Sequence, residues 1–111
     1  MLKEAKMVLR VTTSAYDAEI ASLLMAGAND LEIAGVQIPG SVTFSMEGNT
    51  LTDCSTLMDP LVQRAIFTYV SMRFGNPPNY DRLAEAYELQ KVQLMHSVRY
   101  TDFGESGGDA K

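Results

Sequence analysis

The feature that most constrains the fold is a helix with clear ends in the second half of the chain. Asp59 precedes Pro60, and Gly75 is followed by an Asn-Pro-Pro run. Asp is favoured at the residue before a helix, and Pro at the first helical position. Gly suits the end of a helix, and the two prolines prevent the helix from continuing. The sequence therefore predicts a helix over residues 60–74.

Three further helices follow from the spacing of apolar residues. Apolar side chains recur every three or four positions over residues 2–11, 15–34 and 80–97, as one face of a helix requires. Ser14 and Asn79 are placed to cap the two longer of these helices. At 111 residues the chain suffices for one domain. The predicted fold class is all-α, a small four-helix domain with an extended C-terminal tail.

Residues 36–58 form an insertion between the second and third helices. Val42, Phe44 and Met46 alternate with polar residues, and Gly48-Asn49 can form a tight turn. A short β-hairpin and a long loop pinned by apolar side chains are both compatible with this pattern. We expect residues 1–98 to form one domain that includes the insertion, and residues 99–111 to form the tail.

Charge and hydropathy argue against several classes of function. The net charge of −5 and the pI near 4.7 argue against a nucleic-acid-binding surface, since affinity for phosphate needs clustered Lys and Arg. The predicted helix over residues 15–34 contains no Lys or Arg, which argues against a recognition helix for DNA. No apolar run approaches the roughly 20 residues of a membrane span. We therefore expect a soluble, intracellular protein.

The sequence contains no pattern that predicts catalysis or metal binding. His96 is the lone histidine and has no second ligand at helical spacing, and Cys54 is the single cysteine. Gly-rich phosphate loops and the local pattern around a nucleophilic Ser are also missing. We expect no catalytic residue, no cofactor and no metal, and the chain is not predicted to be an enzyme.

Three helical segments carry a pattern in their order and spacing. Residues 2–11 read Leu-Lys-Glu-Ala-Lys-Met-Val-Leu-Arg-Val, and residues 17–24 read Asp-Ala-Glu-Ile-Ala-Ser-Leu-Leu. Residues 61–70, which follow a Pro, read Leu-Val-Gln-Arg-Ala-Ile-Phe-Thr-Tyr-Val. These segments resemble the head–tail connector (adaptor, or head-completion) proteins of tailed bacteriophages. The resemblance covers the four helices and leaves residues 36–58 and the tail unmatched.

The resemblance implies a structural protein of the virion. Its copies would form a homo-oligomeric ring of about twelve on the portal protein, through a contact that closes by rotation. The ring would extend the DNA channel, through which DNA passes without sequence-specific binding, and would carry the next neck or tail-completion protein. The protein would be made in the bacterial host cytoplasm and reside in the neck between head and tail.

The resemblance also suggests three sets of contact residues. A stripe on the helix over residues 60–74 would form the subunit interface, although a role in the core alone explains it equally well. The insertion would contact a partner or pack locally, and the tail would dock on an adjoining ring. The candidates are, in that order, Phe67, Val70 and Phe74; Val42, Phe44 and Met46; and Arg99, Tyr100 and Phe103.

A different class of function is compatible with the same residues. A small acidic helical adaptor, or an inhibitor of another protein, would show the same composition without any role in a virion. Ring formation and binding to a portal protein would distinguish the connector from this alternative.

Overall fold

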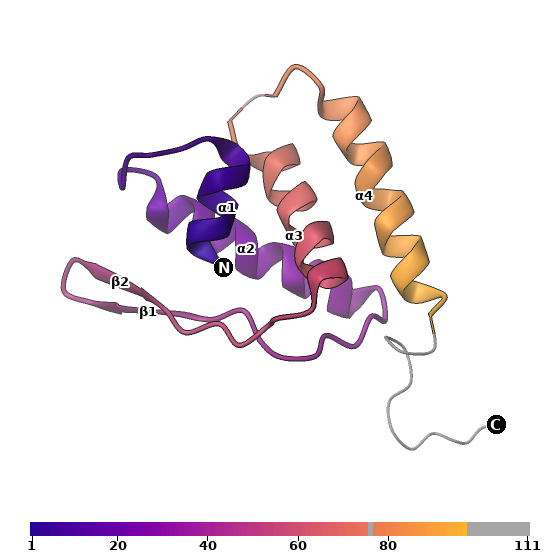
Figure 1. The fold of residues 1–111 in the computed structure, drawn as a ribbon, viewed down its shortest axis with the longest axis horizontal. Coiled ribbons are helices and arrows are strands. Elements are labelled where there is room, and N and C mark those ends of the chain that lie inside the picture. The colour runs from indigo at the N-terminus through magenta and orange to yellow at the C-terminus, as the bar shows by residue number, and fades with distance from the viewer. Residues whose placement is uncertain (76, 98–111) are drawn as a thin grey trace.

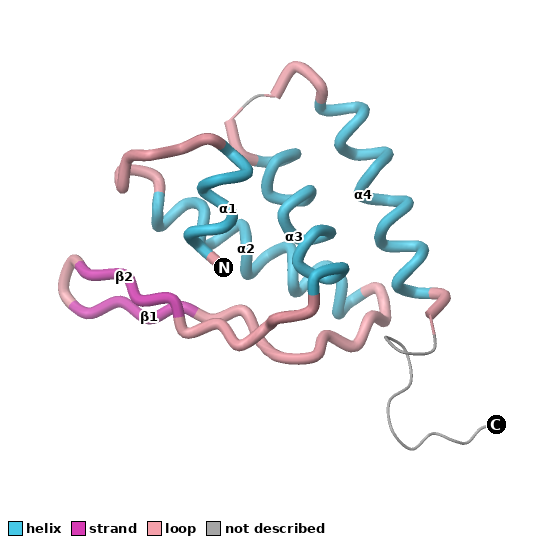
Figure 2. Tube along the Cα trace, in the orientation of Figure 1, coloured by secondary structure: helices cyan, strands magenta, loops and turns pink. Residues whose placement is uncertain are grey.

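The computed structural model describes residues 1–75 and 77–97, which form four helices and one two-stranded antiparallel sheet. The helices are α1 (Leu2–Leu9), α2 (Asp17–Ile33), α3 (Pro60–Arg73) and α4 (Tyr80–Met95), and the strands are β1 (Phe44–Glu47) and β2 (Thr50–Asp53). Figure 1 shows α3 between α1 and α4, with α2 running behind it. The predicted mostly helical fold is confirmed, and the insertion forms a hairpin (Figure 2).

Helix α3 is the centre of the molecule because it carries apolar residues on most of its sides. Its residues Val62, Ala65, Ile66 and Val70 are buried, and the helix packs against α1, α2 and α4. Gly27 of α2 allows the close approach of α2 and α3, since a Cβ atom there would lie 3.0 Å from the ring of Tyr69. The core continues into the other elements through Ala5, Ile20, Leu24, Leu31, Val36, Val42, Leu57, Tyr87 and Leu94.

The ends of α3 are those that the sequence predicts. The Asp59 carboxylate accepts hydrogen bonds from the backbone N–H groups of Leu61 and Val62, at 3.0 and 3.2 Å. Gly75 follows the helix with a φ of 67°, a conformation that glycine adopts without strain. Together these residues account for both ends of the central helix.

The start of α2 differs from the prediction. The helix begins at Asp17 rather than at residue 15, so Tyr16 and not Ser14 occupies the N-cap position. The side chain of Ser14 makes no cap, and its carbonyl oxygen accepts the N–H of Asp17 in a turn. Asp17 forms an ion pair with Lys6 at 2.8 Å, which ties α2 to α1. Asn79 does precede α4, but its side chain makes no capping hydrogen bond either.

A polar link joins α2 to α4 on the far side of α3. The Tyr87 hydroxyl donates a hydrogen bond to the Asp30 carboxylate, and Lys91 Nζ lies 3.4 Å from the same carboxylate. Burial of the ring and the bond to Asp30 raise the pKa of Tyr87 above its ordinary value. The Tyr87 ring also packs edge-on against Tyr69 of α3, with 5.5 Å between ring centroids. These contacts join α4 to α2 directly, in addition to the packing of both helices on α3.

Residues 41–57, which we call the hairpin arm, extend beyond the two strands. Towards the helices the ladder continues, since the N–H groups of Cys54 and Thr56 donate to the carbonyls of Thr43 and Ser41, both at 2.9 Å. Hydroxyl groups complete it, with Thr56 Oγ1 accepting the N–H of Ser41. The arm lies along one side of the helices, and its turn projects past them (Figure 1).

Candidate subunit-contact surface

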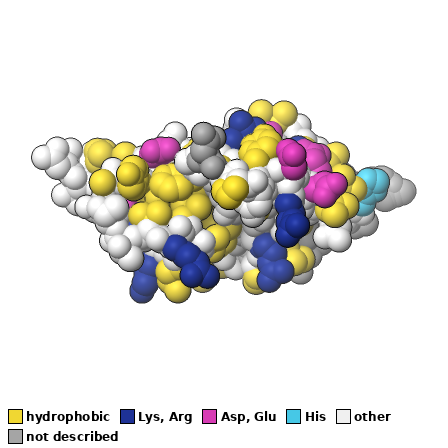
Figure 3. All heavy atoms as spheres, turned by 90° about the horizontal axis from the view of Figure 1, so that it is seen from above, with side chains coloured by type: hydrophobic (Ala, Val, Ile, Leu, Met, Phe, Trp, Pro, Cys, Tyr) yellow, Lys and Arg dark blue, Asp and Glu magenta, His cyan; other side chains and the backbone are white. Residues whose placement is uncertain are grey.

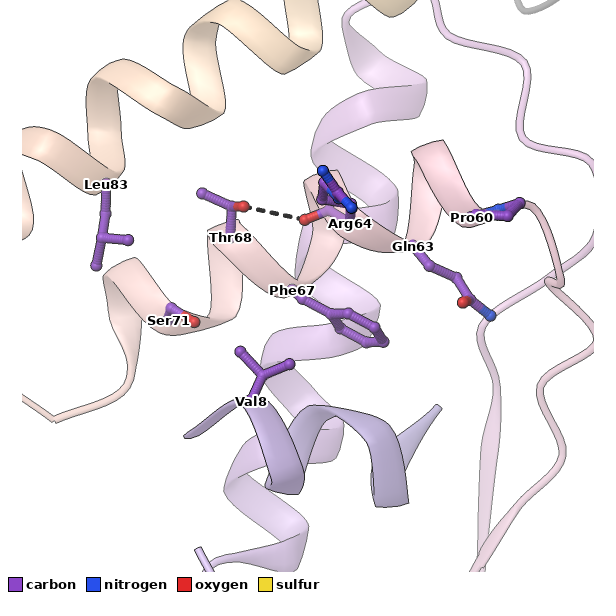
Figure 4. Close-up of a pocket in the computed structure, with 8 residues that line it drawn as sticks. All are labelled: Val8, Pro60, Gln63, Arg64, Phe67, Thr68, Ser71 and Leu83. Atoms are coloured by element: carbon purple, nitrogen blue, oxygen red, sulfur yellow. Dashed lines mark hydrogen bonds between the residues drawn. The ribbon is translucent and has the colours of Figure 1, made fainter. Parts of the chain in front are cut away.

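The outer face of α3 forms the floor of an open groove. Val8 of α1 lies on one wall and Leu83 of α4 on the other, so the groove spans three helices (Figure 4). Its volume is about 440 Å³. We call this hollow the α3 groove, and its lining residues are Val8, Pro60, Gln63, Arg64, Phe67, Thr68, Ser71 and Leu83.

The helical period explains why this face of α3 stays open. Val62, Ile66 and Val70 point into the core, so residues about half a turn away point outward. Thr68 is one of these, and its hydroxyl donates to the carbonyl of Arg64 at 3.0 Å, one turn earlier (Figure 4). Its side-chain donor is therefore bound within the helix, which leaves the groove floor largely apolar.

Arg64 is the basic residue at the centre of this face. It lines the α3 groove and also a second hollow of about 250 Å³ that lies between the start of α3 and the end of α4. Leu61 is 58% exposed at the edge of that second hollow. Within residues 1–75 and 77–97, the guanidinium of Arg64 has no ion-pair partner. An unpaired cation thus sits between exposed apolar side chains.

The three residues predicted for the subunit interface lie in three different environments. Phe67 is half-buried and lines the α3 groove beside Val8 (Figure 4). Val70 is only 1% exposed and belongs to the core. Phe74 packs edge-on against Tyr16, with 5.5 Å between ring centroids, and so joins the end of α3 to the start of α2. Of the three, only Phe67 faces the groove.

The side-chain exposure of the three residues predicted as contacts of the insertion increases along the hairpin arm. Val42 is buried in the core, Phe44 is half-buried against it, and Met46 near the turn is 57% exposed. The register pairs Met46 with Leu51 and Phe44 with Asp53, which places all four on one face of the hairpin. Val42 and Phe44 therefore pack against the core, and Met46 is the most exposed of the three predicted contacts.

Asp53 attaches the arm to the beginning of α1. Its carboxylate accepts hydrogen bonds from the Met1 amino group at 2.7 Å and from the Leu2 N–H at 2.9 Å. Partial burial raises the pKa of Asp53, but the bonds from Met1, Leu2 and Ser55 outweigh it and hold the pKa well below its usual range. The carboxylate therefore stays charged at neutral pH and fixes the arm against α1.

A protein-family model described as a phage connector protein matches residues 1–101. The chain belongs to the phage connector family. No curated protein and no solved structure matches the chain. The matched range includes the hairpin arm, which the resemblance of the helices had left out. The family is structural rather than catalytic, and its members are components of the virion.

Two specific features were sought in the described part of this connector, a group of metal ligands and a membrane-spanning helix. Among residues 1–75 and 77–97, no group of three potential metal ligands comes together. Within the same ranges, no helix has the length and hydropathy to cross a membrane. His96 and Cys54 are both exposed. Arg99, Tyr100 and Phe103, predicted to dock the tail, lie outside the described residues, as does the boundary at residue 98.

Sequence reasoning missed the residues that shape the groove of this connector. Val8 and Leu83 come from helices far apart in the chain, and nothing in either local sequence marks them as neighbours across α3. Arg64 did carry a signal. It is the one basic residue between Pro60 and Met72, in a segment that is otherwise uncharged. That pattern could have identified the exposed side of α3.

Proposed function

We propose that the protein is a structural subunit of the head–tail connector ring of a tailed phage. About twelve copies would surround the DNA channel on the portal protein, joined by a head-to-tail contact that closes by rotation. The ring would lengthen the channel and carry the next neck or tail-completion protein. It would be assembled in the bacterial host and reside in the neck of the virion.

The match of the connector family model over residues 1–101 is the observation that carries this proposal. The surface supports it, because large apolar side chains are exposed at Val8, Leu61 and Leu89 on three different helices. A small domain buries a limited share of its surface and gains stability from association. Exposed apolar side chains on several elements are what a subunit with neighbours on more than one side requires.

The charge of the chain fits a channel through which DNA moves. With a net charge of −5, the protein has no excess of Lys and Arg to hold phosphates. An acidic or neutral lumen repels the DNA backbone weakly and lets the duplex slide. The ring would therefore surround DNA without reading its sequence.

Mass photometry of the full chain, alone and mixed with its cognate portal protein, tests this function. We expect a ring-sized species that forms, or becomes more abundant, on the portal. A monomer or dimer that ignores the portal at every concentration would overturn the proposal. That result would place the chain with small acidic adaptors or inhibitors, which bind a single partner without forming rings.

A further inference from the structure

On the outward face of α4 lies an apolar stripe that none of the helices and strands in residues 1–75 and 77–97 covers. Leu89 and Val92 are 66% and 44% exposed, and Glu85 and His96 extend their row along the helix. The spacing of these four residues is i, i+4, i+7 and i+11, which places them on one side of a helix. Leu83, Tyr87 and Leu94 occupy the opposite side and pack inward. We call the outward row the α4 stripe.

Glu85 gives the α4 stripe an unpaired negative charge. It is exposed, and among the residues that the structure describes no Lys or Arg forms an ion pair with it. Glu88 beside it is already paired with Lys91 at 3.3 Å. The α4 stripe therefore presents one free carboxylate next to two exposed apolar side chains.

The α3 groove offers the complementary set of groups. Its floor carries Arg64 without an ion-pair partner in the described residues, and Val8 and Phe67 lie beside it. Leu61 continues the apolar surface past Arg64. Figure 3 shows that charge is unevenly spread, with Lys and Arg side chains prominent along the lower edge and a group of Asp and Glu side chains at the upper right. Such a distribution favours contact between unlike faces of two copies.

We propose that the α4 stripe of one copy of this chain lies in the α3 groove of the next copy. Leu89 and Val92 would fill the hollow between Val8 and Leu83, and Glu85 would pair with Arg64. This is a helix-in-groove contact, in which apolar anchors at helical spacing enter a hollow and a charge pair sets their register.

The two surfaces lie on different faces of the same molecule, so the contact is head-to-tail. The groove opens over α3, whereas the stripe is on the side of α4 that faces away from α3. Each copy that receives an α4 stripe still presents its own to another copy. A contact of this kind propagates until rotation closes a ring. The inference rests on the proposed ring and names the residues that build it.

Charge reversal on either side tests the contact in the full chain. Arg64→Glu and Glu85→Arg each place like charges opposite one another, and we expect each variant to self-associate about tenfold more weakly than the wild type in sedimentation velocity. An equimolar mixture of the two variants should recover wild-type assembly. In an alternating assembly, every contact in that mixture again joins opposite charges.

Two further variants control for the change in net charge. Lys3→Glu and Glu32→Arg alter exposed charges of α1 and α2 by the same amounts, outside the groove and the stripe. We expect both to assemble like the wild type. Far-UV circular dichroism checks that all four variants keep the helical content of the wild type, so that weaker assembly is not mistaken for loss of fold.

The outcomes separate this inference from the proposed function. If the wild type forms rings and both reversed variants form them equally well, the contact between α4 and the α3 groove is wrong and the connector ring stands. Failure of the mixture to recover assembly would also overturn the contact, because charge complementarity is its basis. If the wild type forms no ring alone or on the portal, the proposed function itself fails.

Discussion

The helical body, made of α1 to α4, and the hairpin arm hold their shapes in different ways. In the body, α3 buries Val62, Ile66 and Val70 against its neighbouring helices. The arm buries Val42 and Leu57 at its base and relies elsewhere on hydrogen bonds, in many of which a Ser or Thr hydroxyl is the acceptor or the donor. Burial is favourable in proportion to apolar area, whereas an exposed hydrogen bond mostly replaces one to water. The body should therefore be the more stable of the two regions.

The largest expected effect comes from the centre of the body. Ile66 is fully buried, so Ile66→Ala leaves a cavity and should lower the free energy of unfolding by about 3 kcal/mol. Urea denaturation followed by far-UV circular dichroism measures this loss. Leu61→Ala, at an exposed position of the same helix, is the matched control and should change stability by less than about 0.5 kcal/mol. Equal losses would show that α3 is not the centre of the core.

A glycine at the base of the arm gives the next largest effect. Gly40 has a φ of 122°, and a Cβ atom there would lie 2.9 Å from the Cα of Leu57. Gly40→Ala should therefore lower the free energy of unfolding by about 2 kcal/mol. Hydrogen exchange should show faster exchange at the amides of Cys54 and Thr56, while those of α3 change less. Gly48→Ala is the control, because Gly48 also has a positive φ but no atom within 4 Å. Gly48→Ala should lower the free energy of unfolding by about 1 kcal/mol.

The cap of α3 joins the arm to the body and should have a smaller effect. Asp59→Ala removes the acceptor for two backbone N–H groups. This change should lower the free energy of unfolding by about 1 kcal/mol and the melting temperature by about 5 °C. Asp59→Asn keeps an acceptor oxygen and should recover most of the loss. If the Asn variant melts as early as the Ala variant, the cap does not depend on that acceptor.

The weakest effect should be a pH dependence of the contact between Asp53 and Met1. The pKa of Asp53 is lowered, so its contribution is present above its unfolded pKa, about 3.9, and is lost as pH falls. Burial lowers the pKa of the Met1 amino group, but bonds to Asp53 and Glu4 outweigh it and raise the pKa above 8.0. That contribution is present below pH 8 and is lost as pH rises through the raised value.

Amide exchange of the arm, measured across the pH range after correction for intrinsic rates, tests this contact. Protection at the base of β2 should be greatest between about pH 4 and 8. Asp53→Asn should flatten the profile, and Glu47→Asn, at an exposed position near the turn, should leave it unchanged. A profile that Asp53→Asn does not alter would show that other groups hold the arm.

The sequence predicted the ends of a helix correctly where residues adjacent in the chain determine them. Asp59-Pro60 and Gly75 give the ends of α3, because a cap and a positive φ depend on residues adjacent in the chain. Ser14 shows the limit of this reasoning, since its backbone forms a turn and the helix begins at Asp17, which pairs with Lys6. The ion pair joins two helices, and a local pattern contains no information about it.

The same limit applies to the candidate contact surface. Periodicity placed Phe67, Val70 and Phe74 among the apolar residues of α3, but it could not say which of them other helices would cover. Val70 is buried in the core and Tyr16 covers part of Phe74, which leaves Phe67 beside the groove. The alternation of Val42, Phe44 and Met46 likewise indicated a strand without showing where the core ends.

By itself the sequence determined the number and order of the helices, the ends of α3, the two-residue period of the insertion and the resemblance to phage connectors. These features depend on hydrogen-bonding and steric preferences of residues close together in the chain. Only the tertiary structure decided that Val8, Arg64 and Leu83 surround one groove and that the α4 stripe faces away from it. A surface exists only after the helices pack, because burial is settled by residues that are distant in sequence.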